Sequence, residues 1–146
     1  MTEPFLIRAA RAEDQSTIVN LVRAARLDPS NLHWQNFVVA EADGQIIGCG
    51  QIRPDPALRE LGSMVVSKAY RRRGVGVAIV RTLQARSQPP LFLECPDYRV
   101  TFYEQVGFHI VPRHTVPWKL RLKATLGDWL LPLLRGPHIR TMRWDG

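Results

Sequence analysis

The feature that most constrains this chain is a run of arginines that leads directly into two glycines, "YRRRGVGVAIV" at residues 70–80. The run follows an apolar stretch typical of a strand, "LGSMVVS", and precedes a segment with the apolar spacing of a helix. A helix N-terminus has unpaired N–H groups and a positive dipole end, and glycines let the backbone approach a phosphate closely. Because arginines add charge-assisted hydrogen bonds, the stretch indicates a pyrophosphate site between a strand and a helix.

Two other phosphate-binding patterns do not fit this stretch. The Walker pattern GxxxxGK(S/T) is absent from the chain, and "GVGVAI" at 74–79 lacks the third glycine of the Rossmann pattern. On the loop alone, a solvated basic loop before a glycine-containing helix stays an alternative.

Hydrophobic periodicity predicts strands and helices along the rest of the chain. Asp43-Gly44 predicts a tight hairpin, Asp14 is a candidate N-cap for the first helix, and Gly107 is a candidate stop for the last helix. Antiparallel strands come first, and a later β-α-β crossover adds a parallel pair. The sequence therefore predicts a single α/β domain over residues 1–146, with a mixed, mostly antiparallel central sheet and helices on both faces. The strands are expected at 5–10, 37–41, 46–53, 59–67, 91–95, 108–112 and 138–144, and the helices at 12–26, 77–87 and 98–108.

Charge and cysteine content narrow the ligands and the compartment. The net charge of +7 favours polyanionic ligands such as nucleic acid, anionic lipid or a phosphorylated cofactor. Cys49 and Cys95 lack the spacing of a disulfide framework or a metal site, so we expect two small buried hydrophobes. No apolar run reaches the ~20 residues of a membrane span, and the first residues do not resemble a signal peptide. A cytoplasmic protein without a metal site is expected.

Three stretches together resemble one known family. The glycine loop fits the pattern (Q/R)-x-x-G-x-(G/A) after a strand and before a helix, "FVVAEADGQIIGCGQI" resembles a central hairpin, and "FYEQVGF" at 102–108 resembles a C-terminal signature. With these motifs in order over about residues 5–112, the chain resembles the GNAT superfamily of acetyl-CoA-dependent N-acetyltransferases. The resemblance implies the GNAT fold, acetyl-CoA as co-substrate, no metal, and acetyl transfer to a primary amine of a small molecule.

The resemblance also implies where the coenzyme binds. The pyrophosphate would lie on the backbone N–H groups of the loop, with the arginine side chains reaching the phosphates. The pantetheine arm would pair with the preceding strand, where the N–H near Val66 would hold the developing oxyanion. The implied coenzyme-binding residues are Met64, Val65, Val66, Arg71, Arg72, Arg73, Gly74, Val75, Gly76 and Val77.

Two residues match the family's catalytic positions. Tyr103 would protonate the departing thiolate as general acid, and its alternative is a core aromatic on an amphipathic helix. Glu60 would be the base that takes the amine proton, directly or through a water, and its alternative is a solvated glutamate at a strand end. Glu41 and Glu94 are weaker base candidates. The stretch "CPDYRVTFY" lacks the Asn that contacts pantetheine in many members, so Asp97 or backbone groups would replace it.

The region after residue 111 departs from the family pattern. Residues 112–137 have the pattern of a basic amphipathic insertion between the last two strands. Three roles for it stay open: a helix that packs on the sheet or at a homodimer contact, a lid over the acceptor, or a contact with a membrane surface through 117–135. Asp128 is its only carboxylate, and no acidic funnel appears at 26–35, so we expect a small neutral or anionic amine rather than a polyamine or a lysine-rich tail. Two alternative functions stay open: a peptide or protein N-acetyltransferase, and a catalytically weak module that binds nucleic acid or membranes, although no nucleic-acid motif is visible.

Overall fold

The computed structural model describes residues 4–55, 57–112, 115–116 and 138–146, which fall into two compact units. The first unit contains the residues up to Pro54 together with Leu61–Ser87. The second contains Asp55–Glu60 and the described residues from Gln88 onward. The predicted insertion at 112–137 lies almost wholly outside the described residues.

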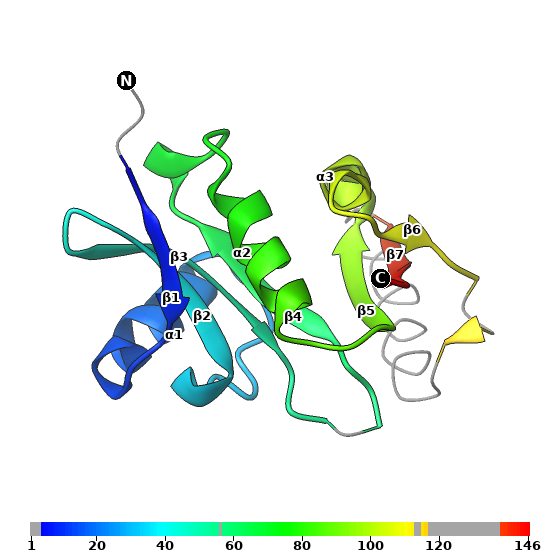
Figure 1. Ribbon diagram of the computed structural model, residues 1–146, viewed down its shortest axis with the longest axis horizontal. Coiled ribbons are helices and arrows are strands. Elements are labelled where there is room, and N and C mark those ends of the chain that lie inside the picture. The colour runs from blue at the N-terminus through cyan, green and yellow to red at the C-terminus, as the bar shows by residue number, and fades with distance from the viewer. Residues whose placement is uncertain (1–3, 56, 113–114, 117–137) are drawn as a thin grey trace. The chain divides into compact units, whose positions relative to one another are not determined.

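A four-stranded antiparallel sheet in the order β1-β2-β3-β4 forms the first unit. Figure 1 shows helices α1 and α2 on opposite sides of these strands. The predicted α/β class with helices on both faces is confirmed. The elements are β1 (Leu6–Ala9), α1 (Gln15–Ala24), β2 (Phe37–Ala42), β3 (Gln45–Ile52), β4 (Leu61–Val66) and α2 (Val75–Ala85), with 3₁₀ turns at Ala12–Asp14, Trp34–Asn36 and Lys68–Tyr70.

The β2–β3 hairpin turns where Asp43-Gly44 predicted it. Ala42 pairs with Gln45, and φ is 50° at Asp43 and 74° at Gly44. Positive φ at both loop positions is typical of a type I′ turn, whose twist matches that of the flanking strands. The hairpin prediction is confirmed.

Alternate residues of this sheet pack against different helices, because successive side chains of a strand point to opposite faces. Phe37, Val39 and Cys49 are buried in a cluster with Ile18 and Val22 of α1. This cluster is the apolar core on the α1 side of the sheet.

Two glycines of β3 let α2 lie close to the opposite face. A Cβ at Gly48 would lie 3.2 Å from Cδ1 of Ile79, and a Cβ at Gly50 would lie 2.9 Å from Cγ2 of the same side chain. The contact at Gly50 is too short for a real side chain and the one at Gly48 is unusually tight, so β3 presents bare backbone there and Ile79 fills the space. The close packing of α2 on the sheet therefore depends on Gly48 and Gly50.

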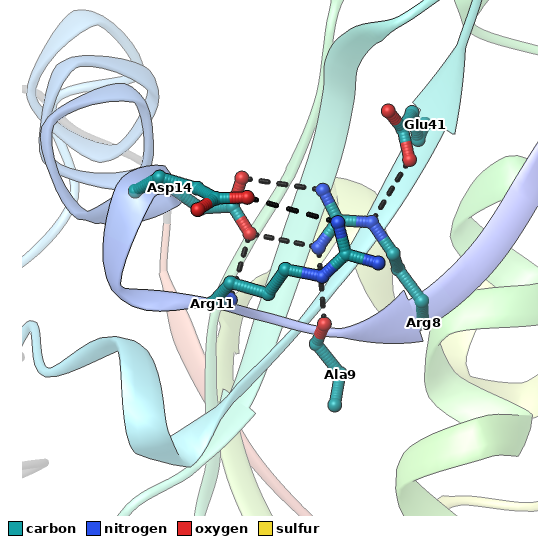
Figure 2. Close-up of polar contacts among 6 residues, drawn as sticks. Arg8, Ala9, Arg11, Asp14 and Glu41 are labelled. Atoms are coloured by element: carbon teal, nitrogen blue, oxygen red, sulfur yellow. Dashed lines mark hydrogen bonds and ion pairs between the residues drawn. The ribbon is translucent and has the colours of Figure 1, made fainter.

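Asp14 immediately precedes α1, but its side chain does not cap that helix. Its carboxylate accepts hydrogen bonds from the Arg8 guanidinium at 2.8 and 3.2 Å, and from the Arg11 backbone N–H at 2.8 Å (Figure 2). Nε of Arg8 also donates to Glu41 at 2.9 Å. Asp14 therefore stands at the predicted N-cap position, but the predicted capping bond is not made because a nearly buried arginine on β1 takes the carboxylate.

The second unit contains a three-stranded antiparallel sheet in the order β5-β7-β6. Leu58, Phe92 and Val116 form a buried cluster in this unit. The predicted stop of α3 at Gly107 is confirmed, because φ is 91° there and the N–H of Phe108 bonds back to Tyr103 O at 3.1 Å. The elements are β5 (Leu91–Pro96), α3 (Val100–Gln105), β6 (His109–Ile110) and β7 (Ile139–Trp144), with a 3₁₀ turn at Asp97–Arg99.

Parallel pairing is shorter than the sequence suggests. Among the described residues it is limited to one bridge, in which Glu60 pairs with Phe92 and the Phe92 N–H donates to Arg59 O at 2.9 Å. From Leu61 onward the chain pairs with β3 in the antiparallel sheet of the first unit. The described strands therefore form two antiparallel sheets, with a single parallel bridge.

Among the helices that the structure describes, none combines the length and the apolar character needed to cross a membrane.

Candidate active site

The loop between β4 and α2 has the backbone geometry of an anion site. Gly74 is the N-cap of α2 with φ of 83°, a left-handed conformation that favours glycine. A Cβ at Gly74 would meet no atom within 4 Å, so the constraint there is conformational and not steric. The first intrahelical bond runs from the Ala78 N–H to Gly74 O at 3.0 Å. The three preceding N–H groups, at 75–77, therefore have no partner within the helix and lie at the positive end of its dipole.

The three arginines of the loop are exposed but do not have the same surroundings. Nε of Arg71 donates to Val66 O at 3.1 Å, which ties the loop to the last residue of β4. The Arg73 guanidinium lies 5.4 Å from the centre of the Tyr70 ring, a cation–π distance. Arg72 has φ of 62°, the left-handed conformation again. The loop thus places three cations beside the N-terminus of α2.

The strand before the loop is the edge strand of its sheet. In the order β1-β2-β3-β4, the ladder of β4 with β3 places Val66 opposite Gly48 and Val65 opposite Cys49. An edge strand offers main-chain groups to an extended ligand arm, as in β-strand addition. Met64 and Val65 are buried, and Val66 is partly exposed.

A β-bulge interrupts β4 just before these residues, and sequence reasoning missed it. The register shifts between Cys49 and Gln51, so that Ser63 and Met64 together face Gly50, and Ser63 has φ of 55°. A bulge bends its strand and redirects the groups that follow. The glycine inside the run "LGSMVV" was the one available sign of it.

Glu60 is buried, with 7% of its surface exposed, and lies in the parallel bridge to Phe92. The alternative of a solvated glutamate at a strand end is therefore wrong. Its role as base stays a prediction.

Tyr103 lies on α3 and is 6% exposed. Its ring makes edge contacts with Phe102 and Phe108, with centroids 4.9 and 5.9 Å apart. Burial raises the pKa of the phenol, with a smaller contribution from Cys95 in the same direction and an opposing one from Arg99. Tyr103 therefore makes the contacts expected of a core aromatic. Its hydroxyl also stays protonated at neutral pH, as a proton donor must.

The remaining candidates are Glu41, Glu94, Asp97 and the two cysteines. The Glu41 carboxylate forms an ion pair with Arg8. Asp97 begins the turn after β5, where its N–H donates to His138 O at 2.9 Å. Burial raises the pKa of Cys49 to about 12 and that of Cys95 to about 11, so both thiols stay protonated and match the expected buried hydrophobes. Glu94 lies on β5 and is partly exposed.

A metal site needs several donor side chains close together. No group of three or more His, Cys, Asp or Glu side chains that could hold a metal ion occurs among the described residues.

The sequence matches one known protein family over a stretch that includes the β4–α2 loop. Residues 33–110, more than half of the chain, match the family described as "Acetyltransferase (GNAT) domain". The chain belongs to the GNAT acetyltransferases. No curated protein matches the sequence significantly.

Solved structures with the same fold agree with this assignment. The N-acetylglutamate synthase of Neisseria gonorrhoeae, complexed with coenzyme A and N-acetyl-glutamate, superposes with a TM-score of 0.75 at 18% identity, over 99% of this chain and 36% of that one. Rv2747 of Mycobacterium tuberculosis, complexed with CoA and NLQ, gives 0.74 at 23% identity over 97% and 99%. Escherichia coli ElaA gives 0.68 at 15% identity over 99% and 100%. This chain therefore spans about a third of the Neisseria protein and nearly the full length of the other two.

Proposed function

We propose that this protein transfers an acetyl group from acetyl-CoA to the primary amine of a small molecule. The observation that carries the proposal is the β4–α2 loop. There a left-handed Gly74 opens a helix whose first N–H groups have no partner within the helix, beside three arginines. The membership of this chain in the GNAT family supports the coenzyme pyrophosphate as the anion that this loop binds.

The coenzyme would lie along the edge of the first unit. Its pyrophosphate would accept hydrogen bonds from the N–H groups at 75–77 and from the arginines at 71–73. Its pantetheine arm would pair with β4 at Met64–Val66. A backbone N–H near Val66 would then hydrogen-bond the thioester oxygen, where negative charge develops during attack. A donor positioned in advance typically contributes ~3 kcal/mol to such a step.

The reaction is a direct attack with balanced proton transfers. The amine lone pair forms the C–N bond, the thioester carbonyl becomes an oxyanion, and its collapse breaks the C–S bond. The proton lost by the amine goes to Glu60, directly or through a water, and the departing thiolate takes a proton from Tyr103. The raised pKa of Tyr103 means that the phenol enters the reaction protonated.

The acceptor is a small neutral or anionic amine, such as an amino acid. The Neisseria structure holds N-acetyl-glutamate, an acetylated amino acid, which supports an acceptor of this kind. In the segment 26–35 the one carboxylate, Asp28, lies 3.6 Å from the Arg53 guanidinium, which leaves little negative charge to attract a polycation. Trp34 in the same segment is partly buried and packs against the α1-side core.

We further propose that the two units act as one acetyltransferase domain. The family match at 33–110 covers elements of both units, including the strands β4 and β5 and the helices α2 and α3. Neither unit alone contains both the coenzyme loop and the candidate catalytic residues.

The test is a pair of measurements on the full chain. Calorimetric titration with acetyl-CoA gives the affinity, and release of free thiol with a panel of amines gives the transfer rate, with the acetylated product confirmed by mass spectrometry. Saturable binding together with transfer to at least one small amine is expected. Absence of coenzyme binding would refute the proposal, and binding without transfer to any amine would identify a binding module instead of an enzyme.

A further inference from the structure

A buried polar contact joins β3 to the bulge of β4 on the side of the sheet that α1 covers. Nε2 of Gln51 donates a hydrogen bond to Oγ of Ser63 at 2.9 Å. Gln51 is 0% exposed and Ser63 is 6% exposed. The neighbouring position along β3 on the same face, Cys49, belongs to the apolar core.

Packing alone does not account for this contact. Oε1 of Gln51 is buried and has no hydrogen-bond partner among the described residues. Turning the amide over would exchange its two ends and still leave one of them without a partner. Buried polar groups are almost always satisfied, and an unsatisfied one destabilises the fold. An apolar pair would fill the same space without that cost, so the polar pair has another role.

The contact holds a strained backbone. Ser63 has φ of 55°, which a residue other than glycine adopts only where its surroundings impose it. Gln51 bonds the Ser63 hydroxyl, and Sγ of Cys49 lies 3.6 Å from the Ser63 carbonyl oxygen. Both side chains come from β3, opposite the register shift. The bulge is therefore held from the neighbouring strand as well as by its own conformation.

We propose that Gln51 is a positioning residue for acetyl transfer: by bonding Ser63 it fixes the bulge of β4 and so aims the backbone of Met64–Val66 at the thioester. This inference rests on the function proposed above. A donor displaced by ~1 Å can lower a rate ~100-fold. The charged contacts proposed for the coenzyme come from the loop at 71–77 and not from β4, so coenzyme affinity should change less than kcat when Gln51 is replaced.

The experiment compares four full-length proteins: wild type, Gln51→Met/Ser63→Ala, Gln51→Met/Ser63→Gly, and Gln84→Met as a matched control at a buried glutamine of α2. Thermal unfolding, the acetyl-CoA dissociation constant, and kcat with the best small amine are measured for each. Amide chemical shifts of Met64, Val65 and Val66 report the strand directly, without turnover.

The alanine double variant is expected to keep its Tm within a few degrees of wild type, because both partners of the buried contact are removed together. Its kcat should fall ~10- to ~100-fold with the dissociation constant within about threefold, and the β4 amide shifts should move. The glycine double variant should recover much of the kcat, because glycine adopts the left-handed conformation without help. Gln84→Met should keep kcat.

Unchanged kcat and β4 amide shifts in the alanine double variant would overturn the inference. A fall in Tm and kcat with no recovery by glycine would also overturn it, because that pattern marks a merely structural pair. A wild type that neither binds acetyl-CoA nor transfers acetyl would overturn the proposed function itself, and its inactivity distinguishes that outcome from the other two.

Discussion

Arg8 on β1 donates two hydrogen bonds to the carboxylate of Asp14, at 2.8 and 3.2 Å, and the two side chains are only 13% and 7% exposed. This pair joins the edge strand to the turn that starts α1, as Figure 2 shows. Arg8 lowers the pKa of Asp14, so the carboxylate is charged throughout the neutral range.

Asp14→Asn is therefore expected to destabilise the protein by ~2 kcal/mol at pH 7, since it leaves a nearly buried guanidinium short of one counter-charge. Because the pKa of Asp14 is lowered on folding, the stability from this pair is present above the ordinary value of about 4 and is lost as pH falls through the lower folded value. The difference in Tm between wild type and Asp14→Asn should shrink between about pH 5 and about pH 2. Glu13→Gln, at an exposed partner of Arg11, is the control and should change little. A constant difference in Tm across this range would contradict the argument.

Coenzyme binding should depend on the loop glycines more than on any one arginine. Gly76→Asp places a carboxylate beside the pyrophosphate and should weaken acetyl-CoA binding by more than ~30-fold. Arg72→Ala removes one of three exposed cations and should weaken it by no more than ~5-fold. Calorimetric titration separates the two, and equal losses would count against a backbone site.

Gly74 offers a separate test of conformation, because a side chain there has room but not the preferred φ. Gly74→Asn should bind acetyl-CoA nearly as well as wild type, since asparagine tolerates the left-handed region, whereas Gly74→Val should bind much more weakly. The same titration measures both. Equal affinities for the two variants would mean that the loop does not require this conformation.

Tyr103→Phe removes the phenol hydroxyl and keeps the ring that contacts Phe102 and Phe108. We expect kcat to fall ~100-fold while the acetyl-CoA dissociation constant stays within a few-fold, because only the proton donor is lost. Steady-state kinetics and calorimetry on the same preparation check this. An unchanged kcat would show that water protonates the thiolate and that Tyr103 is a core aromatic.

The acceptor screen tests the proposed substrate class. Amino acids and small apolar amines should exceed spermidine and lysine-rich peptides in kcat/KM. The reason is that the segment 26–35, which we propose to face the acceptor, has little negative charge to attract a polycation. Best activity with a polyamine or a basic peptide would overturn this choice and leave the acetyltransferase assignment intact.

Local features were predictable from the sequence, and contacts between distant segments were not. Asp43-Gly44 and Gly107 are set by their own backbone conformations, so the hairpin and the end of α3 lie where they were expected. The Asp14 side chain was misassigned because its partner, Arg8, lies on a strand outside the helix.

The same limit applies to the candidate site. The glycine loop could be read from its motif, since strand, loop and helix are contiguous in the chain. The bulge at Ser63 depends on a register shift against β3, and the burial of Glu60 depends on pairing with Phe92, more than thirty residues later. Neither pairing leaves a periodic trace in the sequence.

The glycines at 48 and 50 have a consequence beyond packing. They set how closely Ile79 packs on β3, and Ile79 belongs to the helix whose first turn forms the proposed anion site. We expect a larger residue at either position to displace that helix and, with it, the N–H groups of its first turn. Two glycines in the middle of β3 thus link the packing of the sheet to the position of the proposed anion site, although neither glycine belongs to that loop.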